Sequence, residues 1–91
     1  MPEKLFRLEF KPGWDVHFAK FDNSVQQLIL KKFEKMKQPL VGRGLHSTRY
    51  LVEEVGQYRI AYIEDSKRFV KMVHFVGNHK QYEKWYKSTF R

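Results

Sequence analysis

The sequence contains no cysteine among its 91 residues. This absence excludes disulfide bonds, thiolate nucleophiles and cysteine-based zinc sites, and it fits a reducing cytoplasm. The longest apolar runs span only a few residues, whereas a membrane-spanning helix needs about 20. The opening stretch "MPEKLFRLEF" mixes charges into an alternating pattern and lacks the apolar run of a signal peptide. Because repeats, linkers and low-complexity segments are missing too, we predict one cytoplasmic domain that covers residues 1–91.

Motifs for several kinds of chemistry are also missing. There is no HExxH motif, and four scattered histidines do not indicate a metal site. The "GRG" at 42–44 is neither a phosphate-cradling P-loop nor a dinucleotide fingerprint, and no serine stands in a nucleophile-elbow context. We therefore expect no metal ion and no small-molecule cofactor.

Positive charge is what the sequence has in excess: 18 Lys and Arg stand against 10 Asp and Glu, which gives a net charge of +8 with histidine neutral. Two blocks hold the excess. Residues 31–49 carry six basic side chains against Glu34, and residues 67–91 carry seven against Glu83. Such blocks suit a polyanionic partner. A merely solubilising surface, or one that meets an acidic protein, would have the same composition.

The first half of the chain indicates one strand and two helices. Residues 4–10 alternate loosely, as in a strand, and Pro12-Gly13 ends it. Three aromatic residues at helical spacing between 14 and 21 predict a short amphipathic helix, and "DNS" at 22–24 is typical of the cap of a second one. The second helix has an apolar stripe of Val25, Leu28, Ile29, Phe33, Met36 and Leu40. We expect the two to form a helical hairpin that ends at Pro39.

The second half indicates three strands and a closing helix. Strands are predicted over 49–55, 58–63 and 68–76, joined by short turns into an antiparallel meander. The last of these strands is apolar at both odd and even positions, so both of its faces are expected to be buried, which places it centrally in the sheet. A final helix is predicted over 79–88. The order β-α-α-β-β-β-α predicts an α+β fold: an antiparallel sheet of about four strands, backed by the N-terminal helical hairpin, with a C-terminal helix.

This order of elements resembles the RelE/ParE superfamily of toxins from type II toxin–antitoxin systems. The strand "GQYRIAYI" at 56–63 is similar to the family's G-x-Y-R-apolar-x-Y strand, and "VHFVGNHKQYEKWY" at 73–86 is similar to its closing segment. The ending looks more like the RelE-, HigB- and YafQ-like ribonucleases than like the gyrase-poisoning ParE branch. The resemblance implies a concave basic face that enters the ribosomal A site and cleaves mRNA. It also implies a separate antitoxin chain that covers this face.

Metal-free RNA cleavage uses the neighbouring 2′-hydroxyl as nucleophile, so the protein must supply a base, an acid and cations. Arg59 fits the cation and matches the arginine of the family's Y-R strand. It could instead simply pair with Glu53 or Glu54 across the hairpin. His79 fits the acid or base, because histidine titrates near neutral pH, although it could be an ordinary exposed histidine at the start of a helix.

Further site residues are expected around these two. Tyr82 could stack on a base or orient the leaving group, or its ring could simply be buried. His46 is a candidate because some branches of the family use a second histidine near that place. His74 is predicted to be a hydrogen-bonded core histidine. Contacts to RNA are expected from Arg43, Arg49, Lys80 and Lys84.

One departure from the family pattern affects the mechanism. RelE carries paired lysines on the strand before the Y-R strand, whereas this chain reads "RYLVEEV" there. The lysine base therefore cannot be carried over. Proton transfer by His79, by His46 or by one of the two glutamates remains open, as does weak cleavage. The alternatives to a nuclease are a ParE-like gyrase inhibitor and a degenerate member of the fold that binds RNA or a protein partner.

Overall fold

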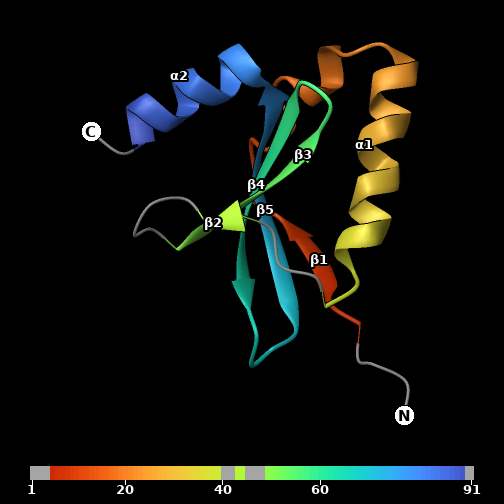
Figure 1. Cartoon of the computed structure of the whole chain (residues 1–91), viewed down its shortest axis with the longest axis vertical. Coiled ribbons are helices and arrows are strands. Elements are labelled where there is room, and N and C mark those ends of the chain that lie inside the picture. The colour runs from red at the N-terminus through yellow and green to blue at the C-terminus, as the bar shows by residue number, and fades with distance from the viewer. Residues whose placement is uncertain (1–4, 40–42, 45–48, 90–91) are drawn as a thin grey trace.

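The computed structural model describes residues 5–39, 43–44 and 49–89. Along the chain the elements are β1 (Arg7–Phe10), the short 3₁₀ helix η1 (Phe18–Lys20), α1 (Asn23–Met36), β2 (Arg43–Gly44), β3 (Tyr50–Val55), β4 (Tyr58–Asp65), β5 (Val70–Asn78) and α2 (His79–Thr89) (Figure 1). This order confirms the predicted α+β class and the C-terminal helix. Within the described ranges, no helix is long and apolar enough to cross a membrane.

All the strands belong to one five-stranded sheet in the order β1-β5-β4-β3-β2. β3, β4 and β5 form the predicted antiparallel meander. β5 lies between β1 and β4, which confirms its central position. β1 pairs with β5 in parallel, with Arg7 opposite Val70, so the sheet is mixed rather than wholly antiparallel. Hairpin turns fix the direction of the meander alone, because β1 reaches β5 through a long connection that no tight turn constrains.

Helix α1 covers one face of the sheet (Figure 1). Asp22 caps its N-terminus by accepting a hydrogen bond from the backbone N–H of Val25 at 3.0 Å. The apolar stripe of α1 packs on β4 and β5 and forms the core Ile29, Phe33, Met36, Ile60, Tyr62, Val73 and Val76. The predicted cap is confirmed, and so is the stripe at Val25, Ile29, Phe33 and Met36. Leu28 is 52% exposed, and Leu40 lies outside the described residues.

The first arm of the predicted helical hairpin is not an α-helix. Within residues 14–21 the backbone forms turns and then η1. Gly13 enters this segment at φ +92°, and the segment is too short to hold α-helical structure by itself. Instead, its aromatic rings pack on the sheet side of α1: the Trp14 ring centroid lies 5.1 Å from Phe18 and 5.8 Å from Phe33. Residues 14–21 therefore cover this side of the core, the role expected of the first helix of the predicted hairpin.

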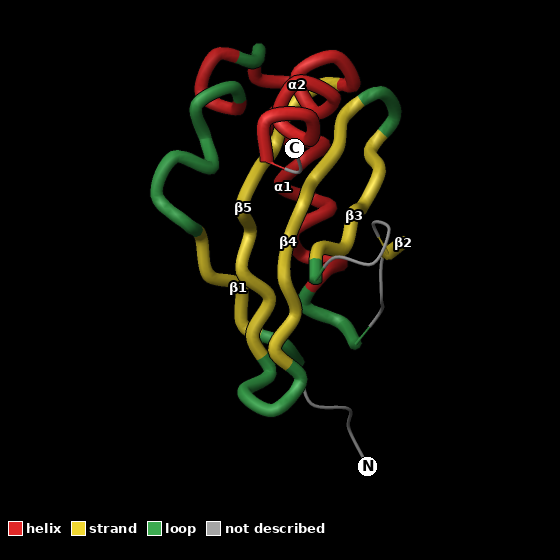
Figure 2. The backbone as a smooth tube through the Cα atoms, turned by 90° about the vertical axis from the view of Figure 1, so that its left-hand side faces the viewer, coloured by secondary structure: helices red, strands yellow, loops and turns green. Residues whose placement is uncertain are grey.

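The face of the sheet opposite α1 is called the open face below. Helix α2 projects from one end of it, and Figure 2, which looks onto this face, shows no other described helix over the strands. Trp85 of α2 stacks on Phe75 with ring centroids 5.2 Å apart and an interplanar angle of 19°. A β-bulge lies beside this contact: Ala61 is opposite Phe75 and Tyr62 is opposite Val73, so His74 is an extra residue in β5.

A lysine is buried on the other face. The Lys71 side chain is fully inaccessible, and its Nζ donates a hydrogen bond to the Gln38 carbonyl at 3.0 Å, just beyond α1. Its ammonium lies 5.0 Å from the centre of the Phe6 ring, within cation–π range. Burial lowers the pKa of Lys71 from its usual value, and the charges of Glu64 and Glu53 oppose that shift. Lys71 thus ties the end of α1 to the central strand.

Candidate functional site

Arg59 lies on β4 directly opposite Gly77 of β5, at the end of the open face where α2 begins. Its Nε lies 3.6 Å from a Glu54 carboxylate oxygen. One terminal nitrogen donates hydrogen bonds to the carbonyls of Gly56 at 3.0 Å and Tyr58 at 3.1 Å. The side chain keeps 18% of its surface exposed. The pairing with Glu54, the plainer of the two predicted roles, is therefore present, and the guanidinium still reaches solvent.

His79 is the first residue of α2, and the local sequence explains why a helix begins there. Asn78 and Gln81 exchange hydrogen bonds: each side-chain oxygen accepts from the other's backbone N–H at 2.8 Å. This is a capping box, which satisfies two backbone donors of the first turn. The His79 Nε2 lies 2.8 Å from a Glu83 carboxylate oxygen one turn later, and the His79 side chain is 56% exposed. The imidazole is therefore held in place and open to solvent.

Arg59 and His79 lie close together in the fold. Arg59 faces Gly77 across the ladder, and His79 follows two residues later. Neighbouring strands are separated by about 5 Å and a strand rises about 3.3 Å per residue, so the two Cα atoms are roughly 8 Å apart. Neither side chain is enclosed in the core. The backbones of Arg59 and His79 thus lie near each other at one end of the sheet, and both side chains reach solvent.

The two adjacent glutamates point to opposite faces, as alternation along β3 requires. Glu53 forms an ion pair with Lys32 of α1 at 3.2 Å, so it belongs to the covered face. Glu54 lies beside Arg59 on the open face. Of the two glutamates, the structure therefore leaves only Glu54 in a position to exchange a proton near Arg59.

The other predicted site residues lie at different distances from this pair. Tyr82 is half-buried on α2, with its ring centroid 6.5 Å from Phe75 and 6.0 Å from Trp85. Lys80 and Lys84 are exposed on the same helix. Arg43 lies in β2 opposite Val52, Arg49 is exposed just before β3, and His46 lies outside the described residues. No group of His, Asp or Glu within the described ranges could hold a metal ion.

Sequence reasoning missed a second polar group on the open face. The Tyr50 hydroxyl and His74 Nδ1 lie 3.2 Å apart, and their rings meet edge to face at 5.1 Å. His74 is hydrogen-bonded, as predicted, but it lines a surface hollow rather than the core. Burial, followed by the charges of Lys11 and Arg49, lowers the pKa of His74 below its usual value. Val70, Met72 and His74 all line this hollow, so alternation along β5 places them on one face. The apolar neighbours at this spacing suggested that the face was core.

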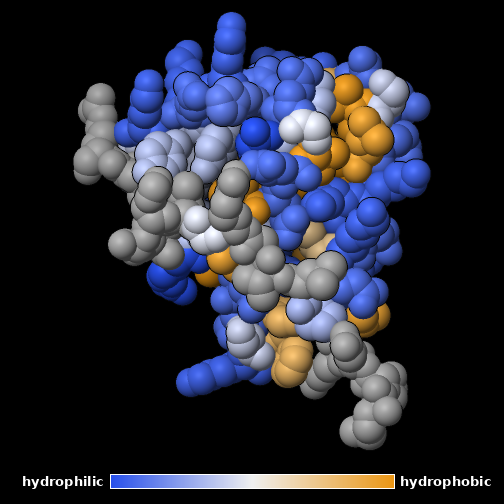
Figure 3. Space-filling view, in the orientation of Figure 1, coloured by the Kyte–Doolittle hydropathy of each residue, from blue (hydrophilic) through white to orange (hydrophobic). Residues whose placement is uncertain are grey.

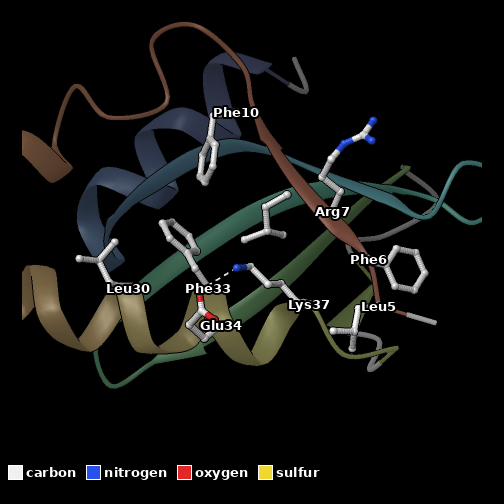
Figure 4. A pocket seen from close by; sticks show the side chains of 9 residues that line it. Leu5, Phe6, Arg7, Phe10, Leu30, Phe33, Glu34 and Lys37 are labelled. Carbon is white, nitrogen blue, oxygen red and sulfur yellow. Dashed lines mark hydrogen bonds and ion pairs between the residues drawn. The ribbon is translucent and has the colours of Figure 1, made fainter. Parts of the chain in front are cut away.

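An apolar groove runs between β1 and α1 on the other side of the molecule (Figure 4). It has a volume of about 680 Å³. Leu5, Phe10 and Leu30 line it and are 55%, 40% and 42% exposed. β1 is the last strand on this side of the sheet. Figure 3 shows a mostly hydrophilic surface, with apolar side chains gathered beside the N-terminal half of α1. These features are typical of a surface that a protein partner covers.

Comparison with known proteins places the fold. No protein-family model and no curated protein sequence matches the chain. Among solved structures, RelE in the archaeal RelE–RelB complex from Pyrococcus horikoshii OT3 is similar with a TM-score of 0.69 and 14% identity, over 82% of this chain and 96% of that chain. A chain of the intact E. coli RelBE toxin–antitoxin complex is similar with a TM-score of 0.68 and 20% identity, over 81% of this chain and 95% of that chain. The isolated E. coli RelE toxin is similar with a TM-score of 0.64 and 20% identity, over 94% of this chain and 99% of that chain. The chain has the RelE fold.

Proposed function

We propose that this protein is the toxin of a type II toxin–antitoxin pair and that it acts in the cytoplasm as a metal-independent endoribonuclease on ribosome-bound mRNA. The RelE fold supports the toxin role, because the similar chains are RelE toxins solved alone or with RelB. The observation that supports the proposed activity is that Arg59 and the start of α2, where His79 lies, are neighbours at one end of the sheet. The net charge of +8 supports a polyanionic substrate.

In the proposed reaction the 2′-hydroxyl of the RNA attacks the adjacent phosphorus. Its proton leaves, the bond from phosphorus to the 5′-oxygen breaks, and that oxygen takes up a proton. Arg59 neutralises the charge that grows on the phosphate oxygens, for which its planar fork is well shaped. His79 transfers a proton, and Glu83 holds its ring. Tyr82 contacts the nucleotide beside them, and His46 remains a candidate for the second proton transfer.

Arg59 and His79 each have a carboxylate partner in this structure. The substrate phosphate therefore has to draw Arg59 away from Glu54, whose contact at 3.6 Å is long for an ion pair. Glu54 itself lies beside Arg59 as a second group that can accept a proton. Further RNA contacts come from the basic residues Arg43, Arg49, Lys80 and Lys84.

A cognate antitoxin is the proposed protein partner. The RelE chains that this fold resembles were solved with RelB. The exposed apolar side chains of the β1–α1 groove support a chain that folds onto this one. The basic blocks suit an acidic segment of the same partner.

The test is cleavage of mRNA in a purified translation system. Arg59→Ala is expected to lower the cleavage rate by about 10²–10³-fold, and His79→Ala by about 10²–10⁴-fold. Lys31→Ala is the control, because Lys31 is an exposed cation on α1, away from the open face. Message that stays intact with toxin in excess over ribosomes would refute the nuclease. Inhibition of DNA supercoiling that is insensitive to His79→Ala would indicate the gyrase-directed branch instead.

A further inference from the structure

The hollow beside His74 is separate from the Arg59–His79 site. It has a volume of about 260 Å³ and is lined by Arg49, Arg68, His74 and an apolar floor that includes Ile63 and Met72. Ile63 follows Arg59 by four residues on β4, which is about 13 Å along a strand. Both sites open on the same face. The hollow is too far from Arg59 to hold the phosphodiester that Arg59 contacts, but a strand of RNA on this face would pass both.

Two guanidiniums, those of Arg49 and Arg68, and two carboxylates, those of Glu9 and Asp65, line the hollow. Neither the Arg49 nor the Arg68 side chain has an ion pair with any described residue. The carboxylates that line the hollow are already engaged. Asp65 accepts hydrogen bonds from two backbone N–H groups of its own turn at 3.1 Å, and Glu9 pairs with Arg7 at 2.9 Å. Both guanidiniums are therefore available for a phosphate, which arginine binds in bidentate fashion.

The remaining groups suit a nucleotide better than a simple anion. The Tyr50 hydroxyl holds one nitrogen of the His74 ring at 3.2 Å. The other ring nitrogen has no hydrogen-bond partner among the described residues. The Tyr50 ring also meets Trp85 of α2 edge to face, with centroids 5.2 Å apart. Aromatic rings, arginines and an apolar floor are what proteins use for unpaired bases. The volume is below the roughly 300–1,000 Å³ of pockets for drug-sized molecules, so one nucleotide is a suitable occupant.

We propose that this hollow is a second RNA subsite, which holds a nucleotide of the same single strand a short distance from the one that is cut. Arg49 and Arg68 bind its phosphate, the His74 ring hydrogen-bonds its sugar or base, and Ile63 and Met72 support the base. The proposal rests on the proposed function in one respect, that the strand bound here is a substrate. Its physical content, binding of single-stranded RNA in the hollow, does not require cleavage.

The test uses a fluorescein-labelled RNA oligonucleotide with 2′-O-methyl groups, which binds but lacks the attacking hydroxyl. Fluorescence anisotropy against salt concentration measures its affinity for the full chain. Arg49→Ala and Arg68→Ala are each expected to weaken binding roughly tenfold and to reduce the salt slope by about 0.7. His74→Gln is expected to weaken binding with no change in slope. Lys31→Ala is the control, because Lys31 is an exposed cation on α1 that does not line the hollow.

NMR of the His74 imidazole supplies a direct readout. Its ring resonances are expected to shift saturably with the oligonucleotide and not with an acidic peptide of equal charge. A response to the peptide alone, or unchanged affinity in both arginine variants, would overturn the subsite. Cleavage kinetics distinguish failure of the subsite proposal from failure of the proposed nuclease function. In an active enzyme the hollow variants are expected to raise KM, whereas Arg59→Ala and His79→Ala lower kcat. If the protein binds RNA in the hollow but cleaves none, the subsite proposal is supported and the nuclease proposal is refuted.

Discussion

Replacing Gly77 with alanine tests how α2 is attached to the sheet. A Cβ at position 77 would lie 2.5 Å and 2.9 Å from two atoms of the Phe75 ring and 3.0 Å from Cβ of Gln81. Neither neighbour is free to move. The Phe75 ring is stacked under Trp85, and Gln81 is held by the capping box with Asn78. The added methyl group must therefore displace the ring and loosen α2, the helix that begins with His79.

The expected size of the effect follows from these contacts. Overpacking a well-packed site costs about 1–3 kcal/mol. Alanine also restricts the unfolded chain, which offsets about 0.4–1 kcal/mol of that loss. The net destabilisation of Gly77→Ala is therefore at most about 2.6 kcal/mol, and the middle of both ranges gives about 1.3 kcal/mol. For a domain of this size each kcal/mol lowers Tm by about 4–8 °C, so the middle value corresponds to a fall in Tm of about 5–10 °C.

Thermal unfolding followed by far-UV circular dichroism measures this change, and tryptophan fluorescence reports the environment of Trp85. Gly44→Ala is the matched control, because no atom lies within 4 Å of a Cβ at that position, and its Tm should stay near that of the wild type. In a Phe75→Leu background, where the obstructing ring is gone, Gly77→Ala should lose most of its effect. An equal loss of Tm in both backgrounds would refute the proposed collision.

Three further predictions concern stability. Asn78→Ala removes both bonds of the capping box and is expected to cost about 1 kcal/mol in urea unfolding; an unchanged midpoint would contradict that role. The pKa of His74 is lowered from 6.5 in the folded protein by burial, Lys11 and Arg49. The unfolded chain therefore binds the extra proton first, and stability should fall as pH drops below about 6.5. His74→Gln should make stability less dependent on pH in this range. If the variant and the wild type lose stability equally as the pH falls, the lowered pKa of His74 is contradicted. Lys71→Met should leave stability equal or raise it at pH 7, because it removes a buried charge; a loss above about 3 kcal/mol in urea unfolding would show that the ammonium is needed.

Local patterns in the sequence were sufficient to predict those elements whose position depends on one nearby interaction. Asp22 marks the start of α1 because its side chain satisfies a backbone donor there. The apolar residues on both parities of β5 reflect burial on both sides of a central strand. Arg59 could be placed across the hairpin from Glu54 because the turn at Gly56 fixes the register of β3 and β4.

Features that depend on distant contacts could not be read in the same way. Residues 14–21 have helical spacing, but rings from α1 hold them in turns. The extra residue at His74 changes which side chains of β5 face α2, and only the pairing with Ala61 and Tyr62 defines it. Lys71 looks like a solvated cation in the sequence, yet Phe6 and Gln38 enclose it from far along the chain. The second polar group on the open face was missed for this reason.

The parallel pairing of β1 with β5 determines when the protein can finish folding during synthesis. β1 leaves the ribosome well before β5, its strand partner among the described residues. Helix α1 and the β3–β4 hairpin can form contacts in the meantime, while β1 stays unpaired until β5 has been made. A nascent chain is therefore expected to lack the finished sheet until β5 has left the ribosome.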